Sequence, residues 1–309
     1  MACVMIILMH SPMPRSSAFG PLLSGISYLT APGIGLFFMV SGALLLRKRD
    51  DSSPFDFKDY LRRRFSKIFW PTLFWTIIGG LLEYWGIHNA ERKILWFMYA
   101  IAGLYLLAPI LIRWLSNACQ GEIEFYLIIW MVSLCYPYLQ SFFVLDQSVK
   151  SWIFYFQGYA GYFVLGAYLS RFKISRVYLH ILKILFLAFS IILPLLTLVM
   201  GWQVNFYSWF WYLSLSVTLQ CVLWWLLLRR FALHMERFRN TITAISKLSF
   251  GIYLVHVFVL HNFLWKMPLM QELPSVLQIL VCTILTFLLS AGICWCLSKW
   301  KYSKYIIGI

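Results

Sequence analysis

The chain has 309 residues, of which 61% are apolar and 19% aromatic, whereas only 12% are charged. A soluble domain usually carries about 25% charged residues because its surface faces water, so this composition excludes a soluble protein and predicts a membrane protein. The net charge of +15 arises from 26 Lys and Arg against 11 Asp and Glu. In a membrane protein such an excess indicates basic cytoplasmic loops rather than nucleic-acid binding.

Apolar segments follow one another along the whole chain, separated by short polar intervals. A helix needs about 20 apolar residues to cross the hydrocarbon core of a bilayer. The segments therefore predict an all-α fold, a bundle of about ten transmembrane helices that forms a single membrane domain over residues 1–309. Their ranges are 2–9, 30–46, 69–87, 94–115, 125–145, 152–169, 178–200, 208–228, 250–265 and 275–297.

The basic residues between these segments alternate between two sides. One side holds 21 of the 26 basic residues. Because cytoplasmic loops retain Lys and Arg, this side is predicted to face the cytoplasm, which places both termini there and the protein in the inner, cytoplasmic membrane as a multi-pass protein. These basic residues lie in the intervals 47–67, 171–183, 229–247 and 299–304 and at Arg113.

The first apolar segment is short. From Met1 to the helix-breaking pair Ser11-Pro12 the chain rises only about 15 Å at 1.5 Å per residue, whereas the hydrocarbon core is about 30 Å thick. We therefore expect the natural first helix to begin upstream of Met1.

Residues 56–71 combine an apolar helical face with basic residues over much of the remainder. This pattern is typical of a helix that lies in the membrane interface. Two interpretations remain open: electrostatic anchoring to anionic lipid, or binding of a cytoplasmic ligand rich in phosphates, such as a coenzyme A thioester.

Ionisable residues also occur inside the apolar segments or at their ends, at His10, Glu83, His256 and His261. Burial of such groups in a membrane is costly, so each is a candidate functional residue. The alternative is a neutral side chain that hydrogen-bonds between helices. The sequence contains no pattern typical of a metal site, so no metal is expected, and its seven cysteines are expected to be reduced and structural.

Four blocks carry a family resemblance. They are an apolar segment that ends in His10, a Phe-Phe-x-x-Ser-Gly block containing Ser41, the sequence Arg63-Arg64-Phe65-Ser66-Lys67 with Pro71, and a Ser-x-Gly-Ile-Tyr-Leu-x-His block with Tyr253 and His256. In this order, they resemble the bacterial acyltransferase-3 family of membrane-bound O-acyltransferases. The resemblance extends over nearly the whole chain.

The resemblance implies transfer of an acyl group, usually acetyl, from cytoplasmic acyl-CoA to a hydroxyl of a cell-envelope glycan or lipid-linked sugar. It implies that His10 is the catalytic base and that Arg63, Arg64 and Lys67 bind the phosphates of acyl-CoA. Ser41, Tyr253 and His256 match family blocks without an implied role, and Glu83 is a further candidate from its place within a span.

Two departures from the family pattern bear on the donor site. Lys67 stands where the family commonly has Arg, so that it would contact phosphate as a point charge. The family's arginines upstream of the catalytic histidine have no counterpart in this chain. The alternative function is a flippase or exporter of lipid-linked sugars, although the matched, interrupted spans typical of transporters are not evident.

Overall fold

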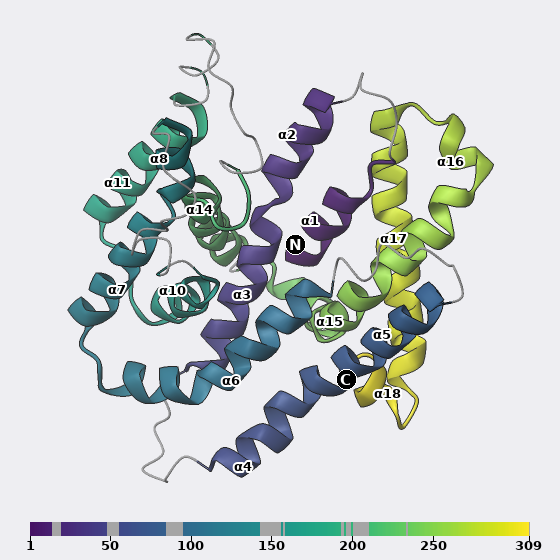
Figure 1. Cartoon of the computed structure of the whole chain (residues 1–309), viewed down its shortest axis with the longest axis horizontal. Helices are drawn as coiled ribbons and strands as arrows, with labels where there is room; N and C mark the ends of the chain where they lie inside the picture. The colour runs from purple at the N-terminus through teal and green to yellow at the C-terminus, as the bar shows by residue number, and fades with distance from the viewer. Residues whose placement is uncertain are drawn as a thin grey trace. The chain divides into compact units, whose positions relative to one another are not determined.

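The computed structural model describes residues 1–13, 20–47, 56–84, 95–142, 156, 158–192, 195, 199, 210–232 and 234–308. Side chains at 20–24, 82–83, 140–142 and 189–190 are outside this description. The described part of the chain consists of helices and turns without a β-strand, as Figure 1 shows. This confirms the predicted all-α class.

Six helical stretches among the described residues are long and apolar enough to cross a membrane. Each overlaps a predicted segment, so the chain is a multi-pass membrane protein. The total of about ten spans and the cytoplasmic location of both termini stay predictions. The stretches are Gly25–Leu45, Trp96–Asn117, Gln120–Leu139, Leu215–Ala232, Glu236–Lys266 and Ser275–Ser298.

The chain divides into two compact units, each built from segments that are distant in sequence. Unit 1 comprises Met1–Ile26, Ser53–Pro109 and Ala232–Ile309. Unit 2 comprises Ser27–Ser52 and Ile110–Phe231. The boundaries fall within α2 (Gly20–Thr30), α6 (Trp96–Asn117) and α14 (Leu215–Ala232). That the whole chain forms one domain stays a prediction.

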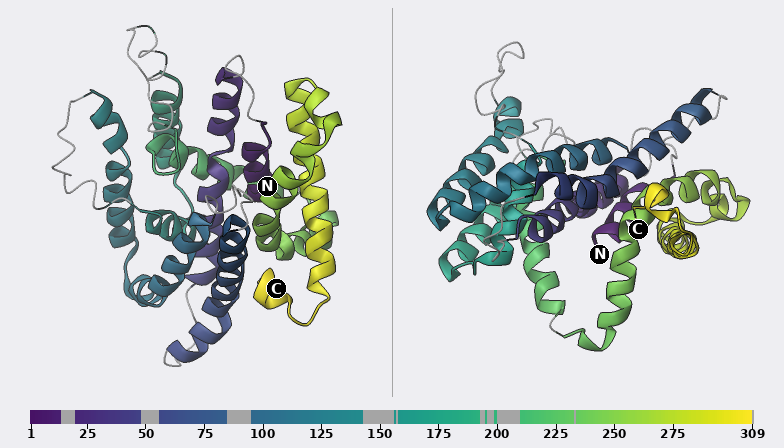
Figure 2. Two further views of the ribbon diagram at one scale, coloured as in Figure 1. Left: turned by 45° about the vertical axis from the view of Figure 1, so that its right-hand side comes forward. Right: turned by 90° about the horizontal axis from the view of Figure 1, so that it is seen from below.

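In unit 1 the short first helix packs against two long C-terminal helices (Figures 1 and 2). Cys3, Ile6 and Ile7 of the first helix are buried in this contact region. The helices that lie wholly in this unit are α1 (Ala2–His10), α4 (Phe57–Tyr60), the π-helical turn η2 (Leu61–Phe65), α5 (Ser66–Tyr84), the 3-10 turns η5 (Glu236–Phe238) and η6 (Leu264–Lys266), α15 (Arg239–Asn262), α16 (Pro268–Glu272), α17 (Ser275–Ser298) and α18 (Ser303–Ile306).

Residues 57–71 are helical, as the amphipathic pattern predicts, but they do not form a uniform α-helix. Asp56 caps the start of this stretch, since the carboxylate accepts a hydrogen bond from the Asp59 N–H at 3.0 Å. The three arginines that follow lie in the π-helical turn η2, which then leads into α5. α18 packs against α5, and the Trp75 Nε1–H donates to the Ile306 carbonyl at 3.0 Å.

In unit 2 the most extensive packing joins α3 (Pro32–Leu45) and α10 (Ala160–Arg171). Gly42 and Gly166 lie where the two backbones meet, and close approach through small residues is how membrane helices commonly pack. Pro32 occupies the first turn of α3, where its missing N–H needs no partner. The other helices of this unit are α7 (Gln120–Ser133), α8 (Tyr136–Phe142), α11 (Arg176–Leu187) and the π-helical turn η4 (Ala188–Ile192).

Candidate functional site

His10 is the last residue of α1, and the residue after it is fixed by hydrogen bonds. The Ser11 hydroxyl donates to the Ile7 carbonyl at 2.8 Å and lies 2.8 Å from the Thr283 hydroxyl of α17. Ser11 has no solvent exposure. A buried hydroxyl with two partners holds the end of α1 against α17.

The Ser11 carbonyl oxygen is held from two further elements. It accepts a hydrogen bond from Trp265 Nε1–H of η6 at 3.2 Å and another from Gln278 Nε2–H of α17 at 3.0 Å. Both lone pairs of this carbonyl are therefore occupied. Because Ser11 directly follows His10, these bonds also restrict where the His10 backbone lies.

The ring of His10 lies beside the ring of His256 in α15. The two ring centroids are 5.6 Å apart and the planes are tilted by 44°. His256 is fully buried, and its Nδ1 lies 2.5 Å from the Tyr253 carbonyl oxygen. Since a carbonyl only accepts, this contact assigns the hydrogen to Nδ1 and leaves a lone pair on Nε2.

His256 Nε2 is buried and has no hydrogen-bond partner among the described residues. The hydroxyls of Thr286 and Ser290 in α17 are also buried without a hydrogen-bond partner among the described residues. Buried polar atoms without partners are uncommon and often occur where a ligand or water binds. Unit 1 therefore contains unsatisfied polar atoms in two helices that pack against each other and against α1.

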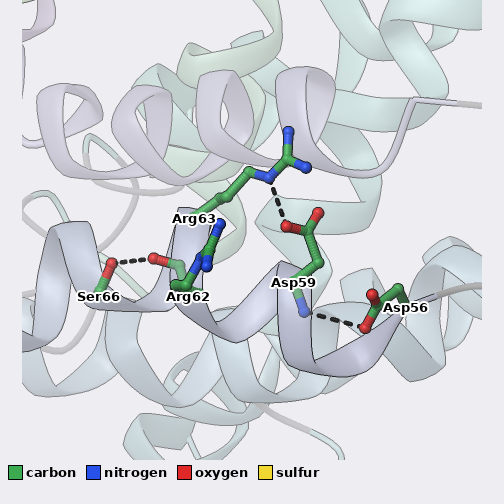
Figure 3. Close-up of polar contacts among 5 residues, drawn as sticks. All are labelled: Asp56, Asp59, Arg62, Arg63 and Ser66. Carbon is green, nitrogen blue, oxygen red and sulfur yellow. Dashed lines mark hydrogen bonds and ion pairs between the residues drawn. The ribbon is translucent and has the colours of Figure 1, made fainter.

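A second group of candidate residues lies on η2 and the start of α5. Arg63, Arg64 and Lys67 are all exposed. Arg63 Nε contacts Asp59 Oδ1 at 2.5 Å, and the Ser66 hydroxyl donates to the Arg62 carbonyl, as Figure 3 shows. An exposed ion pair of this kind contributes only about 0–1 kcal/mol to stability, so Arg63 is available to exchange partners.

The backbone beneath these basic residues is supported by other parts of unit 1. The Tyr60 hydroxyl donates to the Tyr105 carbonyl at 2.7 Å, and burial raises the pKa of this phenol, so it stays protonated and donating. Gly308 lies against the Lys67 carbonyl, and the Trp70 ring packs on Tyr305 at 5.6 Å. The backbone that carries the basic residues is therefore fixed by contacts with other helices of unit 1.

Comparison with known proteins gives the family. A family model described as "Acyltransferase domain" matches residues 1–295. The chain belongs to this acyltransferase family. Comparison with curated proteins and with solved structures gave no match. Family membership confirms the resemblance noted from the sequence, and it favours a transferase over an exporter without transferase activity.

Three of the candidate residues of the acyltransferase meet within unit 1. Tyr253 is buried, and its ring centroid lies 5.4 Å from His256 and 4.8 Å from Phe97, so Tyr253 and both histidines form one cluster. Ser41 is half-buried in α3 of unit 2. Glu83 is in α5, but its side chain lies outside the described residues.

Sequence reasoning missed the residues that hold the end of α1, namely Ser11, Trp265, Gln278 and Thr283. A signal was present in the last apolar segment of the acyltransferase, where Gln278, Thr283, Thr286 and Ser290 recur every three to five residues. Such a polar stripe on an otherwise apolar helix indicates a face that contacts polar groups.

Proposed function

We propose that this acyltransferase transfers an acyl group, with acetyl expected, from cytoplasmic acyl-CoA to a hydroxyl of a cell-envelope glycan or lipid-linked sugar. The observation that carries the proposal is the pairing of His10 with the fully buried His256 in a chain of this family. Two imidazoles that meet in an apolar environment are suited to moving a proton at neutral pH.

His10 acts as the general base in this proposal. It takes the proton from the acceptor hydroxyl while the oxygen attacks the thioester carbonyl carbon, and a tetrahedral intermediate forms. The carbon–sulfur bond then breaks, and the proton held by His10 passes to the departing coenzyme A thiolate. The products are the ester and coenzyme A, and His10 is regenerated. Positioned proton transfer of this kind contributes about 10²–10⁴-fold to the rate.

His256 is assigned the role of orienting His10. Its Nε2 lone pair is buried without a partner, next to the His10 ring. When an N–H of His10 donates to this lone pair during the reaction, the opposite nitrogen of His10 is unprotonated and can accept the proton of the acceptor hydroxyl. This is the general arrangement in which a third group orients the base of a nucleophile–base pair.

Arg63, Arg64 and Lys67 are assigned to the phosphates of acyl-CoA. All three are exposed on one short stretch, and Arg63 is held only by an exposed pair with Asp59. Arginine binds phosphate through two parallel hydrogen bonds, whereas lysine contributes a point charge. The predicted cytoplasmic side of this stretch matches the compartment in which acyl-CoA is found.

The test uses purified protein in detergent with [14C]acetyl-CoA and an envelope-glycan extract as acceptor. Wild type is expected to label the glycan, and His10→Ala is expected to reduce labelling by about 10²-fold or more. His180→Ala is the matched control, because His180 is exposed on α11 and is expected to leave labelling unchanged. Labelling by His10→Ala near the wild-type level would refute the proposed mechanism.

A further inference from the structure

A cavity of about 500 Å³ lies within unit 2, between α7, α10, α11 and α14. Leu127, Leu165 and Leu215 form part of its buried wall. α11 contributes Ile181 and Leu182 to the lining, yet it has no buried residue. The protein therefore leaves apolar side chains of α11 uncovered on the face that lines a cavity.

One carboxylate borders this apolar cavity. Glu124 of α7 lines it, and its Oε1 accepts hydrogen bonds from the Tyr168 hydroxyl at 2.5 Å and from Gln120 Nε2–H at 2.8 Å. Its other oxygen, Oε2, accepts no hydrogen bond from the described residues. Glu124 lies near the start of the candidate span Gln120–Leu139. Two donors already satisfy Oε1, so it is Oε2 that can accept a hydrogen bond from a bound cation.

Basic residues follow Tyr168 where α10 turns into α11. Arg171 donates hydrogen bonds to the Leu115 and Leu46 carbonyls, so its guanidinium is engaged with backbone. Lys173 and Arg176 are exposed, and Ile174 between them lines the cavity. Glu124 thus lines the cavity, and two exposed cations flank Ile174, which lines it too.

We propose that this cavity binds one phospholipid with an amine headgroup, phosphatidylethanolamine. An acyl chain fills the apolar cavity, the headgroup ammonium donates to Glu124 Oε2, and the phosphate contacts Lys173 and Arg176. The charges select this headgroup. An anionic headgroup without an amine places only negative charge near Glu124, and a choline headgroup has no N–H to donate. Most of α11 falls in the apolar segment 178–200 that the sequence predicts to cross the bilayer, where hydrocarbon is the solvent, so a lipid chain would have direct access.

For the test, the protein is reconstituted into nanodiscs that contain phosphatidylethanolamine, phosphatidylglycerol and phosphatidylcholine in equal parts. The protein is then released from the nanodiscs, and native mass spectrometry identifies the lipids that it retains. Wild type is expected to retain one phosphatidylethanolamine. Glu124→Gln is expected to reduce the preference for this lipid about 10- to 100-fold, which corresponds to one lost charge-assisted hydrogen bond. Glu122→Gln is the matched control. In the wild type the Glu122 carboxylate accepts a hydrogen bond from the Cys119 N–H, and the amide oxygen of glutamine can accept the same bond.

A second variant tests the location of the lipid independently of Glu124. Val132 lines the cavity and is 47% exposed, so Val132→Trp fills the space with a side chain that the opening can accommodate. It is expected to lower retention of all three lipids. Equal retention of the three lipids by wild type would overturn the proposal, as would a preference that survives Glu124→Gln or a bound lipid that Val132→Trp does not displace.

Discussion

Gly42 of α3 and Phe163 of α10 touch through their backbones, since a Cβ placed on Gly42 would lie 1.9 Å from the Phe163 carbonyl oxygen. The contact is reciprocal one turn away, where a Cβ on Gly166 would lie 1.9 Å from the Met39 carbonyl oxygen. The two helices can approach this closely only because neither position carries a side chain. In a membrane, where apolar burial adds little, such packing is a main source of helix association.

Gly42→Ala is therefore expected to destabilise unit 2. The added methyl group meets backbone rather than a flexible side chain, so the helices must separate, at a cost of about 1–3 kcal/mol or more. The thermal unfolding midpoint of purified protein in detergent measures this. Gly103→Ala is the matched control, because a Cβ there has nothing within 4 Å and alanine favours a helix. Equal midpoints for the two variants would contradict the close contact.

The sequence offers candidate residues but does not say which of them meet. His10 and His256 were both candidates from their blocks, but 5.6 Å between their rings follows from the packing of α1 on α15. Local periodicity describes which face of a helix is apolar and carries no information on a partner 246 positions further along the chain. The pairing could therefore not be predicted.

Backbone irregularities also escaped prediction. The amphipathic pattern of residues 56–71 assumed 3.6 residues per turn, whereas Leu61–Phe65 form a π-helical turn. Such a turn rotates the side chains that follow it around the helix axis, relative to a regular α-helix. π-bulges are also frequent at functional sites. Of the apolar residues in this stretch, Tyr60 and Ile68 are buried, whereas Phe57 and Phe69 are exposed.

His256→Phe is expected to lower kcat about tenfold or more while leaving the KM for acetyl-CoA unchanged. Phenylalanine keeps an aromatic ring in the buried site but removes the Nε2 lone pair that is proposed to orient His10. Steady-state kinetics with labelled acetyl-CoA would measure both constants. His261→Phe is the control, since it keeps the stacking on Trp265 at 4.0 Å and leaves His256 in place. A change in KM alone would argue against the orienting role.

Thr283→Val is expected to reduce activity by displacing His10. Valine has nearly the shape of threonine but lacks the hydroxyl that lies 2.8 Å from the Ser11 hydroxyl. The lost contact costs about 1 kcal/mol of stability, and a small displacement of the base is expected to lower kcat about tenfold or more. Thr283→Ser retains the hydroxyl and should restore kcat. If serine and valine variants are equally slow, the effect comes from packing and not from the hydrogen bond.

Arg64→Ala is expected to weaken acetyl-CoA binding far more than it alters folding. Arg64 is exposed on η2, so it contributes little to the folded state, whereas loss of a charge-assisted phosphate contact costs about 1.5–3 kcal/mol, or about 10- to 100-fold in Kd. Titration calorimetry with acetyl-CoA in detergent measures the affinity. Raising the salt concentration should also weaken acetyl-CoA binding by the wild type, because the contact is electrostatic and screened.

Arg113→Ala is the control, since Arg113 is an exposed arginine in the last part of α6, outside the basic stretch. The Arg64 variant should also respond less steeply to salt than wild type, as one of the screened contacts is already gone. An unchanged affinity in the variant together with a salt-independent Kd in wild type would remove η2 from the donor site.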